Sequence, residues 1–147
     1  MVIGINKPIE QASPPDVIWG KELSQRQHCL LALMPVYGSR AIVKKRDVSM
    51  HDLAALTAKT GDEFAMFTRK GRRLIVRGDS RMIPLSVYEL AELNELGYRW
   101  SGHTNPGRMF VDLEASYGDK KALLLFTQDR CAIYNALGKY KIFESGG

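Results

Sequence analysis

The residues with the clearest chemical potential lie in the second half of the chain, where a histidine, a loop, a serine and an aspartate follow one another. His103 lies within the segment SGHTNPG (101–107), and SYGD (116–119) begins nine positions after the last glycine of that segment. A strand is expected to carry His103 at its carboxyl end, a Pro-Gly loop turns the chain back, and a helix begins at Ser116 with Asp119 in its first turn. An imidazole and a carboxylate can therefore meet at one point, and both are ligands that zinc accepts.

A glutamate earlier in the chain completes this candidate site. Glu63 begins a strand that we expect to lie beside the strand of His103. A glutamate next to a zinc-bound water is the arrangement that a general base requires. Each residue also has a simpler interpretation, because Ser116 and Asp119 have the spacing of a helix capping box and a lone histidine is usually structural.

Taken in order, these residues resemble the motif of the JAMM/MPN (JAB) metalloproteases, which is His-x-His-Pro, a spacer and Ser-x-x-Asp, with a glutamate on an earlier strand. His103, Pro106, Ser116 and Asp119 match that motif, and Glu63 takes the place of the glutamate. The resemblance covers about residues 62–143. It implies an α+β, JAMM/MPN-like (cytidine-deaminase-like) fold, in which helices flank a mixed sheet.

The resemblance also implies a function, namely that of a zinc-dependent peptidase or isopeptidase. In such enzymes two histidines and the aspartate hold zinc, which implies His103 and Asp119 as ligands here. The glutamate activates the bound water and the serine helps to stabilise the oxyanion, which implies Glu63 and Ser116 as catalytic residues. The substrate would be a protein or peptide, in this family often ubiquitin-like, and Trp100 could line the substrate groove.

One residue departs from the motif, because Asn105 stands where the family has its second histidine. An amide oxygen is a much poorer zinc ligand than an imidazole nitrogen. Three interpretations remain open: a metal-free, non-catalytic interaction module, a weakened zinc site in which Asn105 or a water fills the gap, and an inactivating substitution in an otherwise active enzyme. His28 or His51 could also supply the missing nitrogen. We therefore expect a JAMM-type peptidase whose zinc is lost or weak, with the interaction module as the alternative.

The elements that must position these residues follow from turn and cap signals. Capping-box spacing at Ser49 and Ser86 predicts two helices, which end at Gly61 and Gly97. A third helix opens at Ser116, and a further one is predicted over 21–34 before Pro35. The predicted strands are 41–43, 63–68, 72–78, 98–103, 130–135 and 139–143. Such a mixture of separated helices and hairpins is typical of the α+β class.

Composition excludes several classes of protein. The chain has 147 residues, a formal net charge of +5, 45% hydrophobic residues and 25% charged residues, which are ordinary values for a globular domain. No run approaches the roughly 18 apolar residues of a membrane helix, and no signal peptide is visible. Two cysteines are too few for a disulfide scaffold or a four-cysteine zinc site. We expect no membrane partner, and the oligomeric state stays open.

We divide the chain at residue 45. Residues 1–45 are predicted to be an N-terminal linker or arm with an accessory helix, and residues 46–147 the JAMM/MPN-like domain. The segment PDVIWGKE (15–22) resembles the junction before C-terminal domains of bacterial polymorphic toxins. That resemblance implies an effector domain that is delivered as part of a larger secreted protein, the alternative being a cytoplasmic protein.

Basic residues cluster in two places. Lys44, Lys45 and Arg46 form one run, and the segment RKGRR (69–73) lies at a predicted hairpin turn, with Arg77 nearby. This could be a nucleic-acid patch, but charged hairpin edges also protect sheets from pairing with other strands. From the sequence alone we favour the protected edge and expect a protein or peptide partner rather than nucleic acid.

Overall fold

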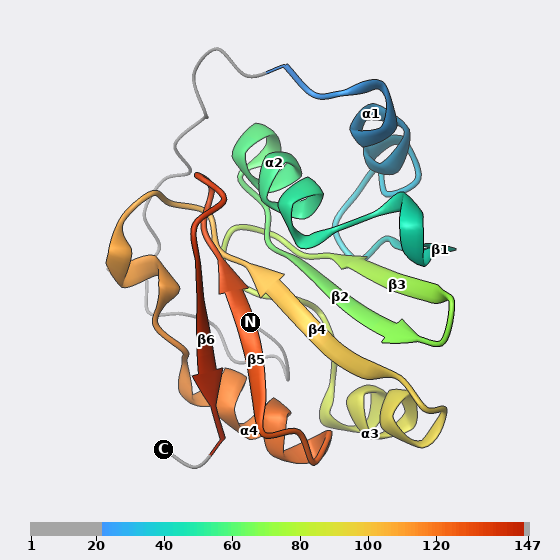
Figure 1. The fold of residues 1–147 in the computed structure, drawn as a ribbon, viewed down its shortest axis with the longest axis vertical. Coiled ribbons are helices and arrows are strands. Elements are labelled where there is room, and N and C mark those ends of the chain that lie inside the picture. Colours follow the sequence, from blue (N-terminus) through green and yellow to red (C-terminus); the bar gives the residue numbers. More distant parts are fainter. Residues whose placement is uncertain (1–21, 146–147) are drawn as a thin grey trace.

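The computed structural model describes residues 22–145, which form a mixed six-stranded sheet with helices on both faces (Figure 1). The strand order is β1-β3-β2-β4-β5-β6, in which β4 and β5 are parallel and all other neighbours are antiparallel. The strands are β1 (Arg40–Lys44), β2 (Phe64–Arg69), β3 (Arg72–Arg77), β4 (Arg99–Thr104), β5 (Arg130–Tyr134) and β6 (Tyr140–Glu144). The helices are α1 (Gln25–Ala32), α2 (Met50–Thr60), α3 (Val87–Glu95) and α4 (Tyr117–Leu125), with the short 3₁₀ helices η2 (Lys45–Asp47) and η3 (Phe110–Leu113). The predicted α+β class is confirmed.

Local hydrogen bonds explain where the helices begin. Each of the four α-helices in residues 22–145 starts with a serine capping box, in which the serine hydroxyl accepts the N–H three residues on and the side chain there accepts the serine N–H. The predicted starts at Ser49, Ser86 and Ser116 are confirmed, and α1 begins after Ser24, later than predicted. Gly61 ends α2 in the left-handed conformation with φ of 78°.

Alternation along the strands divides the core into two layers. Phe64 and Met66 point to the face covered by α1 and α2, whereas Ala65 and Phe67 point to the face covered by α3 and α4. Figure 1 shows these two pairs of helices on opposite sides of the sheet. A central strand that is buried on both faces has a nearly continuous run of apolar residues in its sequence, and β2 is buried over its first four residues.

A bulge interrupts the pairing of β2 with β4. Ala65 is opposite His103 and Phe67 is opposite Trp100, so that two residues of β2 span three of β4. The extra residue shifts the alternation of β4, and His103 therefore lies on the same face as Trp100 instead of the opposite one. This face is the one that α4 covers, and the bulge therefore directs the histidine toward that helix.

The predicted accessory helix and the strand that follows it pack against the rest of the described chain. Leu30 and Met34 pack in the same core layer as α2, and β1 forms five residue pairs with β3. Residues 25–44 thus belong to the same sheet and core as the rest of the described chain. Residues 1–21 of the predicted linker, which include most of the segment PDVIWGKE (15–22), lie outside the described residues.

Within residues 22–145 no helix is both long enough and apolar enough to cross a bilayer.

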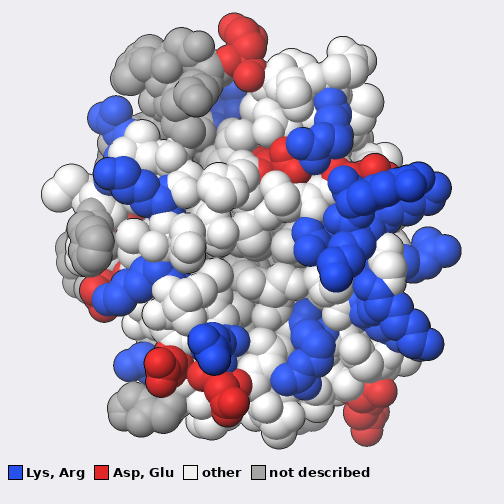
Figure 2. Space-filling model, in the orientation of Figure 1, with Lys and Arg blue, Asp and Glu red and all other residues white. Residues whose placement is uncertain are grey.

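On the surface, Lys and Arg side chains gather over the side of the molecule that holds the β2–β3 turn and the end of β1 (Figure 2).

We expect Gly78→Ala to destabilise the fold, since a Cβ at this position would lie 2.0 Å from the carbonyl oxygen of Met82. The turn that contains Gly78 also holds the backbone of Glu63 in place, because the Gly78 N–H donates to the Glu63 carbonyl oxygen at 2.8 Å. Overpacking of this kind costs about 1–3 kcal/mol. The free energy of unfolding in urea measures it, and Gly71→Ala is the matched control because a Cβ there meets no atom within 4 Å. Equal unfolding midpoints for the two variants would contradict the prediction.

Candidate functional site

Three elements that are distant in sequence bring the predicted site residues together. His103 lies near the end of β4, Glu63 directly precedes β2, and Asp119 is the third residue of α4. All three side chains are almost fully buried, with exposed fractions of 0% for Glu63 and His103 and 1% for Asp119. The expected neighbourhood of the two strands is confirmed by their pairing.

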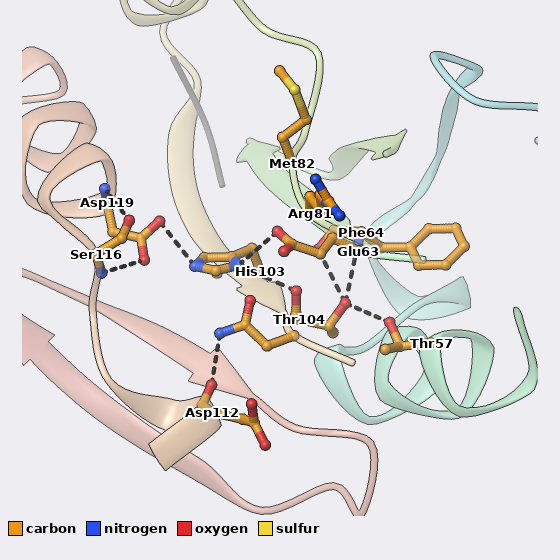
Figure 3. A network of polar contacts seen from close by, with 12 residues as sticks. Thr57, Glu63, Phe64, Arg81, Met82, His103, Thr104, Asp112, Ser116 and Asp119 are labelled. Carbon is orange, nitrogen blue, oxygen red and sulfur yellow. Dashed lines mark hydrogen bonds and ion pairs between the residues drawn. The ribbon is translucent and has the colours of Figure 1, made fainter. Parts of the chain in front are cut away.

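The imidazole of His103 lies between the two carboxylates (Figure 3). Its Nε2 atom is 3.1 Å from Oδ1 of Asp119, and its Nδ1 atom is 3.8 Å from Oε1 of Glu63 and 3.2 Å from the carbonyl oxygen of Thr104. Nε2 and Oδ1 thus form a buried contact at ion-pair distance. The ring therefore presents Nε2 and Asp119 presents Oδ1 to the same small region of space.

The ring of His103 is also held from its face. Trp100 stacks on it with ring centroids 5.8 Å apart and planes at 12°, and the indole N–H donates to the Gly102 carbonyl oxygen. Trp100 is only 2% exposed and packs on Phe143 as well, which differs from the accessible position that a groove-lining residue needs. In this structure Trp100 supports the histidine from within the core.

Ser116 and Asp119 form the capping box that starts α4, and the two oxygens of Asp119 have different roles. Oδ2 accepts the Ser116 N–H at 2.9 Å, while Oδ1 faces His103. Burial raises the pKa of the Asp119 carboxyl, but the charge of His103 and the Ser116 N–H outweigh it and hold this pKa well below its ordinary value of 3.8. The Ser116 hydroxyl accepts the Asp119 N–H at 3.0 Å, so its observed role is structural.

Asn105 lies two residues beyond His103 and is 2% exposed. Its backbone N–H donates to the carbonyl oxygen of Tyr134 at 2.8 Å, and its side-chain NH₂ donates to the carbonyl oxygen of Asp112 at 2.6 Å. The amide thus ties the end of β4 to η3 within the loop that leads to α4. This is the role of a structural asparagine.

The donor atoms fit a zinc site only in part. Neighbouring ligands of a tetrahedral zinc are roughly 3.3 Å apart, which is close to the distance between Nε2 of His103 and Oδ1 of Asp119. A catalytic zinc needs three protein ligands, and Asn105, which aligns with the second histidine of the motif, directs its side-chain NH₂ to the carbonyl oxygen of Asp112. Among residues 22–145 no group of three or more His, Cys, Asp or Glu side chains is arranged to hold a metal ion. The residues present therefore do not complete a zinc site.

Neither of the other histidines fills this gap. His28 is on α1 and His51 is on α2, where its ring contacts Tyr134 edge-on with centroids 5.2 Å apart. Both helices cover the face of the sheet opposite to His103. The possibility that one of them supplies the missing nitrogen is wrong for this structure.

Two supporting residues were missed from the sequence. The hydroxyl of Thr104 accepts the Phe64 N–H at 2.9 Å and contacts the hydroxyl of Thr57, which joins β4 to β2 and α2 beside the site. Thr104 stands inside the motif segment, but Thr57 lies in the middle of a helix with no local signal. Only the pairing of distant elements reveals its role.

In comparisons with protein-family models, curated proteins and solved structures, nothing matches this chain.

We expect Asp119→Asn to lower the free energy of unfolding at pH 7 by about 1.5–3 kcal/mol, the usual value of a buried hydrogen-bonded charge. The lowered pKa means that the carboxylate stabilises the fold fully above about pH 4 and progressively less as the pH falls below it. The difference between parent and variant in urea unfolding should therefore narrow from pH 7 to pH 3.

The control is Glu89→Gln, at the same capping position of α3 but with a side chain that is 42% exposed. We expect a smaller cost there. A pH-independent difference for Asp119→Asn would show that its charge does not stabilise the fold.

Proposed function

We propose that this chain carries a JAMM-type peptidase or isopeptidase site whose metal centre is incomplete, so that the chain as it stands is inactive or weakened. The observation that carries the proposal is the buried contact of 3.1 Å between Nε2 of His103 and Oδ1 of Asp119, the two donor atoms that would hold a metal. Glu63 lies on the Nδ1 side of the ring, and its role as general base stays a prediction. The candidate substrates are proteins or peptides.

The burial of three titratable side chains beside one another supports this proposal. Burying charged groups disfavours folding unless they are paired, and three titratable side chains converge here within a few ångströms. Groups of this kind cluster at functional sites, because a shared environment tunes their proton affinities. In the chain as it is, the imidazole of His103 lies between the carboxylates of Asp119 and Glu63.

Asn105 accounts for the incompleteness. It lies two residues after His103, where the motif has its second histidine, and its side chain is buried, as are those of His103 and Asp119. A histidine at this position would add the third ligand that a catalytic zinc needs. The proposal thus assigns the loss of metal to a single side chain.

The variant Asn105→His tests the proposal directly. We expect its zinc affinity, measured by calorimetry with zinc chloride, to exceed that of the parent by at least about tenfold, since one more nitrogen ligand completes the set. Zinc should also raise the melting temperature of the variant, because a ligand that binds only the folded state stabilises it. Hydrolysis of peptide or isopeptide bonds should appear in the variant and disappear when Glu63→Gln is added.

Two control variants distinguish zinc binding at the proposed site from adventitious zinc binding elsewhere. Asn94→His adds a histidine on α3 and should leave zinc affinity unchanged. Removing the first ligand in the double variant His103→Ala/Asn105→His should abolish the gain. If Asn105→His folds as the parent does and binds zinc no better, the metal interpretation fails.

A second candidate function, a non-catalytic interaction module, is favoured by the hydrogen bond between Asn105 and the carbonyl oxygen of Asp112. An asparagine that holds a loop in place has a use of its own without any metal. Partner binding by such a module would be insensitive to chelators and to Glu63→Gln.

On this second interpretation we expect Asn105→Ala to lower the free energy of unfolding by about 1–3 kcal/mol, because it leaves the buried Asp112 carbonyl without this donor. The parent should unfold at the same urea concentration in EDTA and in zinc. A parent that is stabilised by zinc would favour a retained metal site over the metal-free module.

A further inference from the structure

Six exposed cations form one corner of the molecule, which we call the basic corner: Lys44, Lys45, Arg46, Arg69, Lys70 and Arg72. Figure 2 shows the blue side chains that gather on this side of the surface. The corner unites the two basic runs of the sequence, which are separated along the chain by α2 and most of β2.

Sheet pairing brings the two runs together. Arg72 of β3 is the pairing partner of Lys44 on one side and of Arg69 on the other, so that three cations stand in one row across three strands. The turn between β2 and β3 approaches η2, because the Lys45 N–H donates to the Gly71 carbonyl oxygen at 2.8 Å. Like charges directly opposite each other weaken a sheet, so this row lowers the stability of the fold. Its presence is therefore not explained by folding.

The cations of the basic corner are not neutralised within the described part of the chain. Other basic residues have acidic partners, such as Arg77 with Asp62 at 2.8 Å and Lys141 with Glu114 at 3.0 Å. No such ion pair with a described residue involves any of the six. Of the six cations, Lys44 alone belongs to an edge strand, β1, so protection of the edge from unwanted pairing leaves most of this cluster unexplained.

Two open hollows in the basic corner are lined mostly by basic residues. One, of about 430 Å³, is lined by Lys44, Arg69, Lys70, Gly71, Arg72 and Tyr98, and the other, of about 420 Å³, by Lys44, Lys45, Arg46 and Gly71. Forked guanidinium groups and mobile ammonium groups are the usual ligands of phosphate oxygens. We propose that the basic corner binds the phosphate backbone of nucleic acid without reading its sequence.

The lining of the hollows favours a nucleic-acid backbone over an acidic protein. Protein interfaces depend on apolar and aromatic anchors at their centre, and here Tyr98 is the one aromatic residue of the lining, with 8% of its surface exposed. The same burial leaves no ring on which a base could stack. Neighbouring strands are about 4.8 Å apart, so the row of cations can follow successive phosphates.

The basic corner does not depend on the proposed peptidase site. Glu63 directly precedes β2, whereas Arg69 is the last residue of that strand, which places the two surfaces at opposite ends of β2. A six-residue strand spans about 20 Å. Binding at the corner can therefore be tested in a protein whose site residues are all intact.

The experiment measures the binding of a fluorescein-labelled single-stranded DNA of about 20 nucleotides by fluorescence anisotropy at several salt concentrations. The affinity should fall linearly with salt on logarithmic axes, with a slope of about −0.7 for each phosphate contacted. The variant Lys44→Gln/Lys70→Gln/Arg72→Gln should bind at least about tenfold more weakly, and its salt slope should be shallower by about 2.

The matched control removes the same charge elsewhere. Lys120→Gln/Lys121→Gln/Lys139→Gln alters exposed lysines of α4 and of the β5–β6 turn, and should keep the affinity of the parent within about twofold. Equal losses in the two triple variants would mean that only net charge matters and would overturn the proposal. So would the absence of binding at low salt, and so would competition by polyglutamate as strong as by unlabelled DNA of equal charge, which would indicate an acidic protein partner.

Discussion

The contact between the His103 ring and the Asp119 carboxylate is the interaction on which the candidate site depends, and it exists because β4 carries one residue more than the strand it pairs with. The bulge changes the face to which His103 points, so that its ring stacks on Trp100 and faces the first turn of α4. Without the extra residue, His103 would point to the face of α2, away from Asp119. A local irregularity in a central strand thus creates a polar site inside an apolar layer.

The first turn of α4 connects folding to chemistry. The same Ser-x-x-Asp sequence that starts the helix leaves one carboxylate oxygen on the Ser116 N–H and turns the other toward the histidine. The capping box therefore orients Asp119 at no extra conformational cost, because the rotamer that caps the helix is the one that meets His103. The structural and functional interpretations of Ser116 and Asp119 are compatible for this reason, and the cap alone does not distinguish them.

Buried charged groups and exposed charged groups lie at opposite ends of β2. At the start of this strand, carboxylates and an imidazole are buried and paired, whereas at its far end lysines and arginines are exposed and face water. Buried charges need partners, because the protein interior solvates them poorly, and exposed charges of one sign are tolerated because water and salt screen them. The proposed peptidase-type site and the proposed polyanion-binding surface therefore lie at opposite ends of one strand.

The sequence by itself determined the elements with short-range signals: the capping boxes at Ser49, Ser86 and Ser116, the glycine that ends α2, the Lys70-Gly71 turn and the order of strands and helices. These depend on hydrogen bonds and backbone preferences within a few residues. The sequence also indicated that Glu63, His103 and Asp119 could meet.

Only the tertiary structure decided that Trp100 is buried under His103, that Asn105 holds Asp112, and that Arg72 lies between Lys44 and Arg69. Those features depend on strand register and on one bulge, and register is set by contacts between segments far apart in the chain.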